Sequence, residues 1–167
     1  MSKNNEYYFD DVRELIHYLF SNYGNLSPLK LQKGLYFLFA YYGALYGNKQ
    51  NSSLERKEVE YDYPKFLFNA NFEAWDYGPV IRDVYFENKR GEYSPYAAAT
   101  IQPEEVFGED VEVRHFVKEI FDQVVETSDF SLVDRSHEDI AWKKIHDAGE
   151  VDMSNEEIVN EYSQEYI

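Results

Sequence analysis

Apolar residues recur at intervals of three and four near the start of the chain, the spacing that gives an α-helix one apolar face. Asp10 and Asp11 stand just before this segment, where the helix dipole favours acidic side chains. Gly24 follows the segment and can take the left-handed conformation that ends many helices. These features predict a helix over residues 12–23, with an apolar face formed by Val12, Leu15, Ile16, Leu19, Phe20 and Tyr23.

A second helix is predicted to begin at Ser27 and Pro28. Serine is a good N-cap, and proline suits the first helical position because its missing N–H would have no helical partner there. Residues 29–46 are apolar on nearly every side after Lys33, which predicts a helix in the centre of the fold. The uncharged part, residues 34–46, has 13 residues, whereas a membrane span needs about 20.

The remaining pattern is shorter and less regular. Residues 72–75 alternate between apolar and polar types, as a short strand or an extended segment does. Tyr77-Gly78-Pro79 is expected to form a turn that starts a third helix. The buried face of that third helix is expected to contain Val80, Ile81, Val84 and Tyr85. A fourth helix is expected over residues 113–124, followed by a turn around Phe130–Asp134 and a helix from about His137 to Ala148. A capping box of Ser154 and Glu157 predicts a last short helix.

The sum of these elements is a mainly α fold. We expect a compact single domain of five or six helices with at most a short strand element. Residues 1–8 are expected to form an N-terminal tail and residues 9–163 the domain. Stretches at about residues 47–70 and 91–110 predict long connections, the first with room for a short strand over Val59–Tyr63.

Composition narrows the classes of function. The 167 residues include 32 acids and 16 bases, giving a net charge of −16, whereas nucleic acids and anionic membranes are bound by basic patches. The chain has no cysteine, which excludes disulfides, cysteine-ligated zinc, iron–sulfur clusters and a cysteine nucleophile. Residues 1–10 are polar and acidic, unlike a signal peptide, so we expect a cytoplasmic protein.

The sequence contains no recognisable pattern of an enzyme site. It lacks the nucleophile elbow G-x-S-x-G. His137-Glu138-Asp139 with His146-Asp147 is the densest group of potential ligands, but on one straight helix the two histidines would stand about 13 Å apart and could not share a metal ion. The favoured interpretation is a helix capped by Ser136, with acids that complement its dipole. We predict no catalytic residue, no metal and no cofactor.

Two large side chains stand out against their surroundings. Lys33 interrupts an apolar helix, and a buried lysine without a partner is costly. It should therefore reach solvent or a carboxylate, within the fold or on a partner. Trp75 stands beside the stiff Tyr77-Gly78-Pro79 turn and is expected either to fill the core or to contact a partner directly.

The acidic charge is concentrated in two stretches. Residues 147–167 contain seven acids and no base, and residues 101–126 contain eight acids and two bases. Such a surface either keeps the protein soluble or attracts a basic partner and speeds its association. The residues predicted to steer a basic partner are Glu150, Asp152, Glu156, Glu157 and Glu161.

Three ordered segments resemble the SocA-like or Panacea antitoxin domain family. They are Leu31-Gln32-Lys33-Gly34-Leu35-Tyr36-Phe37, the stretch Phe72-Glu73-Ala74-Trp75-Asp76-Tyr77-Gly78-Pro79-Val80 with Val84-Tyr85, and the late segment from Leu132 to Trp142. The resemblance covers almost the whole chain. Gly34 departs from the family pattern, in which a bulky apolar residue is more typical.

The resemblance implies a compact, mainly α domain of bacteria, phages and prophages that binds and neutralises a toxin protein, without enzymatic activity. One member of the family delivers its toxin to a ClpXP-type protease as an adaptor. Carried over to this chain, the motif positions near a functional surface are Lys33, Trp75, Tyr77 and His137.

Four functions follow for testing. The leading hypothesis is an antitoxin-like binding protein that neutralises a basic toxin, its cognate partner, by direct contact. The second is an acidic, phage-encoded inhibitor of a host defence enzyme that handles nucleic acid. The third is a proteolytic adaptor of the ClpXP type. The last, a metal-dependent hydrolase built on His137, Glu138 and Asp139, has the least support.

Overall fold

The computed structural model describes residues 6–48 and 63–166. Helices dominate this part of the chain, which confirms the mainly α prediction, and two small sheets accompany them. The elements are β1 (Tyr7–Phe9), α1 (Val12–Tyr23), α2 (Pro28–Tyr42), the π-helical turn η1 (Gly43–Gly47), β2 (Phe66–Phe68), β3 (Phe72–Trp75), β4 (Gly78–Ile81), α4 (Arg82–Lys89), α5 (Ser94–Ala97), α6 (Pro103–Phe107), α7 (Val111–Glu126), α8 (Asp129–His137), α9 (Ile140–Asp147) and α10 (Asn155–Glu165).

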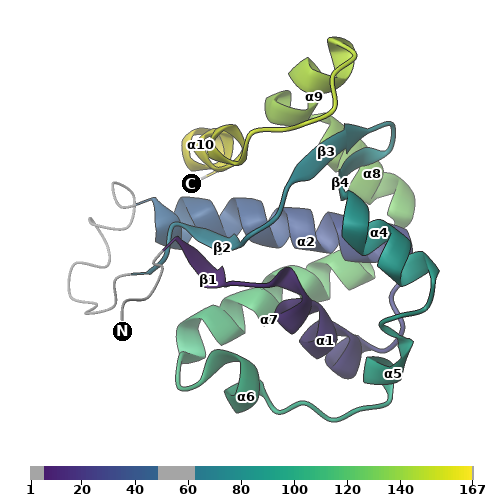
Figure 1. Ribbon diagram of the computed structural model, residues 1–167. Helices are drawn as coiled ribbons and strands as arrows, with labels where there is room; N and C mark the ends of the chain where they lie inside the picture. The colour runs from purple at the N-terminus through teal and green to yellow at the C-terminus, as the bar shows by residue number, and fades with distance from the viewer. Residues whose placement is uncertain (1–5, 49–62, 167) are drawn as a thin grey trace.

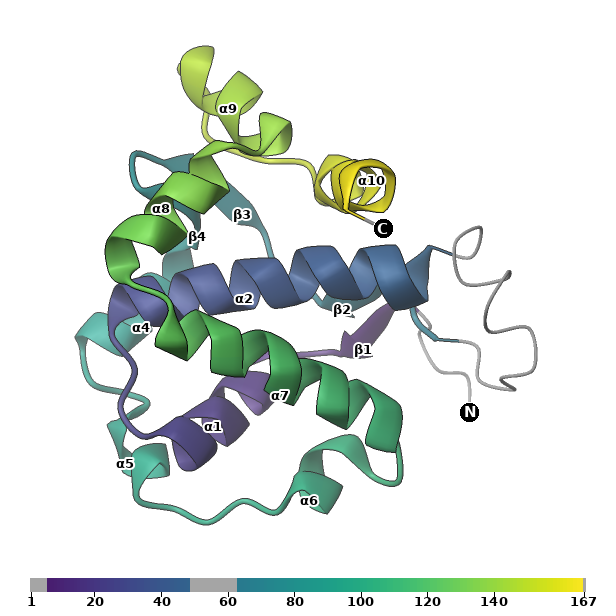
Figure 2. The same cartoon turned by 180° about the vertical axis from the view of Figure 1, so that it is seen from behind.

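The central element is α2, which runs through the middle of the molecule with other segments packed around it (Figures 1 and 2). Its start follows the sequence, because Ser27 caps the helix by accepting a hydrogen bond from the N–H of Lys30 and Pro28 occupies the first turn. Helices α7, α8 and α10 and strands β2 and β4 all contact it. A helix covered on so many sides must be apolar nearly all round, as the sequence predicts.

Helix α1 also has the predicted bounds. Asp11 caps its first turn by accepting from the N–H of Arg13, and Gly24, with φ of 82°, ends it. The helix packs against α5 and α6. None of the helices among residues 6–48 and 63–166 has the length and apolar character that crossing a membrane requires.

The number of helices exceeds the five or six expected, since nine α-helices occur within the described ranges. Two of the additional helices, α5 and α6, lie in the predicted connection over residues 91–110. Both carry proline in the first turn, where proline is compatible with a helix, and in α6 the carboxylate of Glu105 accepts from the N–H of Gln102. The prolines that predict a connection over residues 91–110 instead stand in the first turns of two short helices.

The strands form two separate pairs. Strand β1 runs parallel to β2, pairing Tyr7 with Phe66, and so includes residues expected in the N-terminal tail. Strand β3 confirms the extended segment predicted over residues 72–75, and residues 151–153 bond to its other edge. A short strand was also considered over Val59–Tyr63. Residues 59–62 of that segment lie outside the described part of the chain.

The expected helix start at Tyr77-Gly78-Pro79 is wrong. Gly78, with φ of 113°, instead closes a two-residue turn, and residues 78–81 return as β4 antiparallel to β3. Val80 and Ile81 are buried in this extended form, and α4 begins only at Arg82. A short apolar run can be a strand or a helix start, and contacts with α2 decide the outcome here.

The helix expected from about His137 to Ala148 is confirmed over α9, but its start is wrong, because α9 begins only at Ile140. The turn expected around Phe130–Asp134 is also wrong. Ser128 caps α8 by accepting from the N–H of Ser131, and α8 continues through the predicted turn to His137. The chain then bends, and α9 begins after Asp139. Ser136 is not a cap: it is buried within α8, where its hydroxyl donates to the carbonyl of Val133.

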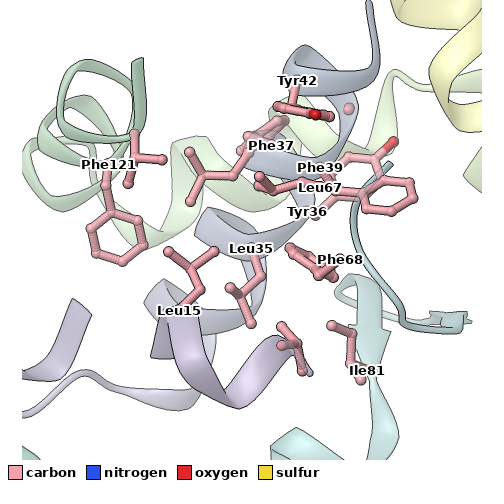
Figure 3. Close-up of a cluster of buried hydrophobic side chains, with 14 of the residues drawn as sticks. Leu15, Leu35, Tyr36, Phe37, Phe39, Tyr42, Leu67, Phe68, Ile81 and Phe121 are labelled. Atoms are coloured by element: carbon pink, nitrogen blue, oxygen red, sulfur yellow. The ribbon is translucent and has the colours of Figure 1, made fainter. Parts of the chain in front are cut away.

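Aromatic side chains fill the core around α2 (Figure 3). The rings of Phe39 and Phe66 stack with their centroids 5.5 Å apart. Phe121 of α7 packs against Gly34, where a Cβ would lie 2.8 Å from Cδ1 of the ring and closer still to Cε1. The glycine that departs from the family pattern is therefore a position at which α7 packs closely against the central helix.

We predict that Gly34→Ala lowers the free energy of unfolding. The methyl group would overlap the Phe121 ring, and this overpacking should outweigh the gain of about 1 kcal/mol in helix propensity, for a net loss of about 1–2 kcal/mol. Urea unfolding measures the change. The double variant with Phe121→Leu should lose less than the sum of the two single variants; a Gly34→Ala protein as stable as the wild type would contradict the close packing.

Candidate functional site

A pocket of about 710 Å³ opens where the first turns of α2 meet the β3–β4 turn, α4 and the start of α8. It brings together three of the four motif residues predicted to lie near a functional surface, Lys33, Trp75 and Tyr77. The fourth, His137, bonds to the turn that forms one wall. The lining residues are Ser27, Pro28, Leu29, Gln32, Lys33, Trp75, Asp76, Tyr77, Val80, Tyr85 and Asp129.

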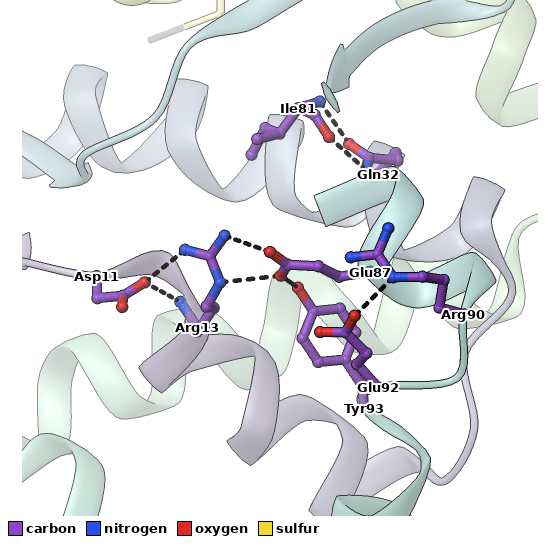
Figure 4. Close-up of polar contacts among 8 residues, drawn as sticks. All are labelled: Asp11, Arg13, Gln32, Ile81, Glu87, Arg90, Glu92 and Tyr93. Carbon is purple, nitrogen blue, oxygen red and sulfur yellow. Dashed lines mark hydrogen bonds and ion pairs between the residues drawn. The ribbon is translucent and has the colours of Figure 1, made fainter. Parts of the chain in front are cut away.

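Gln32 fastens β4 to the central helix. Its side-chain oxygen accepts from the N–H of Ile81 at 2.8 Å, and its nitrogen donates to the carbonyl of the same residue at 3.2 Å (Figure 4). The buried amide thus replaces the neighbouring strand that β4 lacks on this edge. Sequence reasoning did not single out Gln32, although a polar residue beside Lys33 in an apolar helix was a usable signal.

Lys33 forms the floor of the pocket. Its side chain is 1% exposed, and Nζ donates to the carbonyl of Pro79 at 3.1 Å. The expectation that it reaches solvent or a carboxylate is wrong: none of the described carboxylates lies within ion-pair distance. Burial lowers the pKa of Lys33 to about 7, because the charged form loses its hydration.

Gly78 makes this position of the lysine possible. A Cβ at residue 78 would lie 2.8 Å from Cε of Lys33 and 2.5 Å from the hydroxyl of Ser136. The turn can therefore close over the amine only with glycine, which also tolerates the φ of 113°. The Tyr-Gly-Pro segment and the Gln-Lys segment of the two motifs meet here.

The turn between β3 and β4 is held from behind by a stack of three rings. The indole of Trp142 lies between the imidazoles of His137 and His146, with centroid distances of 4.3 and 4.5 Å. Its Nε1 donates to the carbonyl of Trp75 at 2.9 Å. Nε2 of His137 bonds to the backbone oxygen of Asp76 and Nε2 of His146 to its carboxylate, each at 2.9 Å.

This arrangement gives the two histidines a positioning role. They come from two helices, α8 and α9, and contact opposite faces of one ring, so they fix the turn rather than a common ion. Within residues 6–48 and 63–166 no cluster of three or more histidines and carboxylates has the geometry of a metal site.

Three aromatic side chains line the pocket, and two more lie next to its lining residues. Tyr77 is 72% exposed at the tip of the turn. Trp75 packs edge-on against Tyr85, with centroids 5.1 Å apart, and Phe86 lies behind it. Phe130, beside the pocket residue Asp129, is 75% exposed. We call Trp75, Tyr77, Tyr85, Phe86 and Phe130 the aromatic rim.

A buried carboxylate secures the bend between α8 and α9. Asp139 accepts from the hydroxyls of Tyr36 at 2.5 Å and Tyr162 at 2.6 Å and from the guanidinium of Arg135 at 2.9 Å. Burial and the neighbouring carboxylate raise the pKa of both tyrosines well above their usual range. The motif residue Tyr36 therefore joins α2 to the helices behind the pocket.

The five acids predicted to steer a basic partner lie outside this pocket. Glu161 accepts from the N–H groups of Ile140 and Ala141 at the start of α9, at 2.7 and 2.9 Å. Glu157 pairs with Lys144, and Glu156 pairs with Lys65. The remaining two are exposed: Glu150, and Asp152, which accepts from the amide of Asn71. Steering by this group stays a prediction.

Comparison with known proteins gives one match. The family model described as "Antitoxin SocA-like, Panacea domain" matches residues 31–143, a range that includes Gln32, Lys33, the β3–β4 turn and His137. Neither a curated protein nor a solved structure matches the chain.

The buried lysine predicts a pH-dependent stability. A pKa near 7 in the folded state, against about 10.5 in the unfolded chain, means that the unfolded state binds one more proton between these values. Stability should therefore rise by up to about 1.4 kcal/mol per pH unit from about pH 7 towards pH 10. Chemical unfolding at several pH values measures this rise.

Lys33→Met should remove the rise, because methionine fills a similar volume without a titrating group. Lys143→Met, at an exposed position of α9, is the matched control and should keep the wild-type pH dependence. Equal slopes for wild type and Lys33→Met would show that the amine is not buried in this way.

Proposed function

The chain belongs to the antitoxin SocA-like, Panacea domain family, and on this basis we propose that it neutralises a protein toxin by direct contact through the pocket and its aromatic rim. The observation that carries this proposal is Tyr77, a large ring 72% exposed on a turn that is held by three hydrogen bonds. An exposed aromatic side chain on a fixed backbone loses little entropy on binding, and such residues dominate many protein interfaces.

Neutralisation by this surface is occlusion. The partner would seat an anchor in the pocket, between Trp75 and the first turn of α2, and cover its own working surface in doing so. No chemical step is required of the antitoxin. The proposal therefore needs a rigid, preorganised surface rather than a reactive group, and the ring stack behind the turn supplies that rigidity.

The proposed partner is a basic protein. The net charge of −16 creates a field that attracts cationic surfaces and speeds their association. Toxins that act on nucleic acids carry such surfaces, because they must bind phosphates. The same charge fits an inhibitor of a basic host defence enzyme, and the identity of the captured partner distinguishes the two.

We predict that Tyr77→Ala weakens partner binding about 30-fold, the ratio that corresponds to the loss of about 2 kcal/mol at an interface hot spot. Tagged wild-type protein first captures the partner from nuclease-treated lysate of its native host. Titration calorimetry then gives Kd, and co-expression with the partner gives protection of growth, which Tyr77→Ala should lose.

Val111→Ala is the matched control, since Val111 is 52% exposed at the start of α7, away from the pocket. Both variants should unfold at the wild-type denaturant concentration. Unchanged affinity in Tyr77→Ala would show that the partner binds elsewhere, and a captured protease whose action on the partner requires this chain and ATP would favour the adaptor function.

The acidic surface predicts a salt-dependent association rate. Raising NaCl from about 0.1 M to 1 M shortens the Debye length from about 10 Å to about 3 Å, and the rate should fall roughly tenfold. Stopped-flow mixing with the captured partner measures it. A variant that neutralises Glu150, Asp152, Glu156 and Glu157 should show a lower rate and a weaker salt dependence, whereas Glu161 is retained because it caps α9. A rate indifferent to salt rejects steering.

A further inference from the structure

The amine of Lys33 is buried without a counter-ion. It has three donors when charged, and the structure gives it one acceptor, the carbonyl of Pro79 at 3.1 Å. An ammonium ion removed from water is stabilised mainly by an opposite charge, which none of the described residues supplies at this position. Lys33 is itself 1% exposed, but it is among the residues that line a pocket open to solvent, and this pocket is the side from which an acceptor could reach the unused donors.

The other polar groups near the floor already have partners. Both polar atoms of the Gln32 side chain bond to the backbone of Ile81, and the hydroxyl of Ser136 donates to Val133. The walls above are largely apolar, formed by residues such as Trp75 and Val80. Lys33 is therefore the buried charged side chain of the described pocket lining, and it retains unused donors.

Two carboxylates at the mouth of the pocket oppose an anionic guest, but weakly. The side chains of Asp76 and Asp129 are 88% and 58% exposed, and each faces a positive or hydrogen-bonding partner, His146 at 2.9 Å and Lys30 at 3.7 Å. Water and salt screen exposed charges strongly, whereas the interaction with a buried amine is screened much less. The attraction at the floor should thus exceed the repulsion at the mouth.

We propose that the pocket receives a segment of the protein partner that carries a carboxylate next to a large apolar side chain, with the carboxylate paired to Nζ of Lys33 and the apolar group against Trp75 and Tyr85. A volume of about 710 Å³ is of the size that holds a drug-like ligand, so both groups fit together. The inference rests on the proposed function only in that the occupant is a piece of protein.

Three probes of one shape test the charge preference without the partner. They are 3-phenylpropionate, 3-phenylpropanamide and 3-phenylpropylamine, which carry a negative, a neutral and a positive end. Titration followed by NMR, at the indole N–H of Trp75 and the amide of Tyr77, should give about tenfold tighter binding for the carboxylate than for the amide. The amine probe should bind most weakly.

Lys33→Met should bind the carboxylate and the amide equally, while Lys143→Met keeps the wild-type ratio. The comparison among probes uses the wild-type protein, so it stands even where Lys33→Met fails to fold. Equal affinity of carboxylate and amide, tighter binding of the amine probe, or no shift at these two residues with any probe would overturn the inference. Capture of the partner is a separate experiment, so failure of the proposed function is recognised independently.

Proton uptake is a second readout of the same contact. In the protein without a guest, the pKa of Lys33 is about 7, so its amine is mostly neutral at pH 8 and mostly charged at pH 6. Binding of a carboxylate favours the charged amine, so Lys33 should take up about one proton on binding at pH 8 and much less at pH 6. Calorimetry with 3-phenylpropionate in two buffers of different ionisation enthalpy measures the uptake. The other titratable groups that line the pocket are Asp76, Tyr77, Tyr85 and Asp129; uptake that persists in Lys33→Met would assign the proton to one of these and contradict the pairing.

Discussion

The site depends on hydrogen bonds that three polar side chains of α2 make inside the core. A helix covered on most sides could be apolar throughout, yet Gln32, Lys33 and Tyr36 reach the backbone of Ile81, the backbone of Pro79 and the carboxylate of Asp139. Buried polar groups are costly unless they are paired, so each of these contacts fixes a segment distant in sequence at one place along the helix. Strand β4, which lines the pocket through Val80, and the α8–α9 bend, next to which His137 holds the β3–β4 turn, are both located in this way.

The parts of the fold that local signals define were predictable from sequence. Helices α1 and α2 have capping residues, regular apolar spacing and a clear end or start, and the structure confirms both. The alternation over residues 72–75 predicts a short strand or an extended segment, and β3 has this form. The errors fall where a tertiary contact decides between two locally acceptable forms: β4 is extended because Gln32 completes its edge, and the chain bends before α9 because Asp139 binds two tyrosines from elsewhere.

The sequence was sufficient to predict which residues belong to the candidate site, but not which contacts each of them makes. The motif positions Lys33, Trp75 and Tyr77 do share one pocket. Their separate roles could not be predicted, because the partner of Lys33 is a backbone carbonyl 46 positions away and not a carboxylate. Sequence shows which side chains are unusual for their surroundings; it does not show which backbone atoms the folded chain brings to them. His146 was named only as a potential ligand, and its positioning role could not be predicted for the same reason, since its contact with Asp76 spans 70 positions.

The ring stack behind the β3–β4 turn gives the molecule an optical property. The chain has two tryptophans; Trp75 lies in the pocket wall and Trp142 lies between two imidazoles directly behind the same turn. All indole emission of the native protein therefore originates within one small region. The intrinsic fluorescence of the unlabelled protein therefore reports on the surface where a guest would bind.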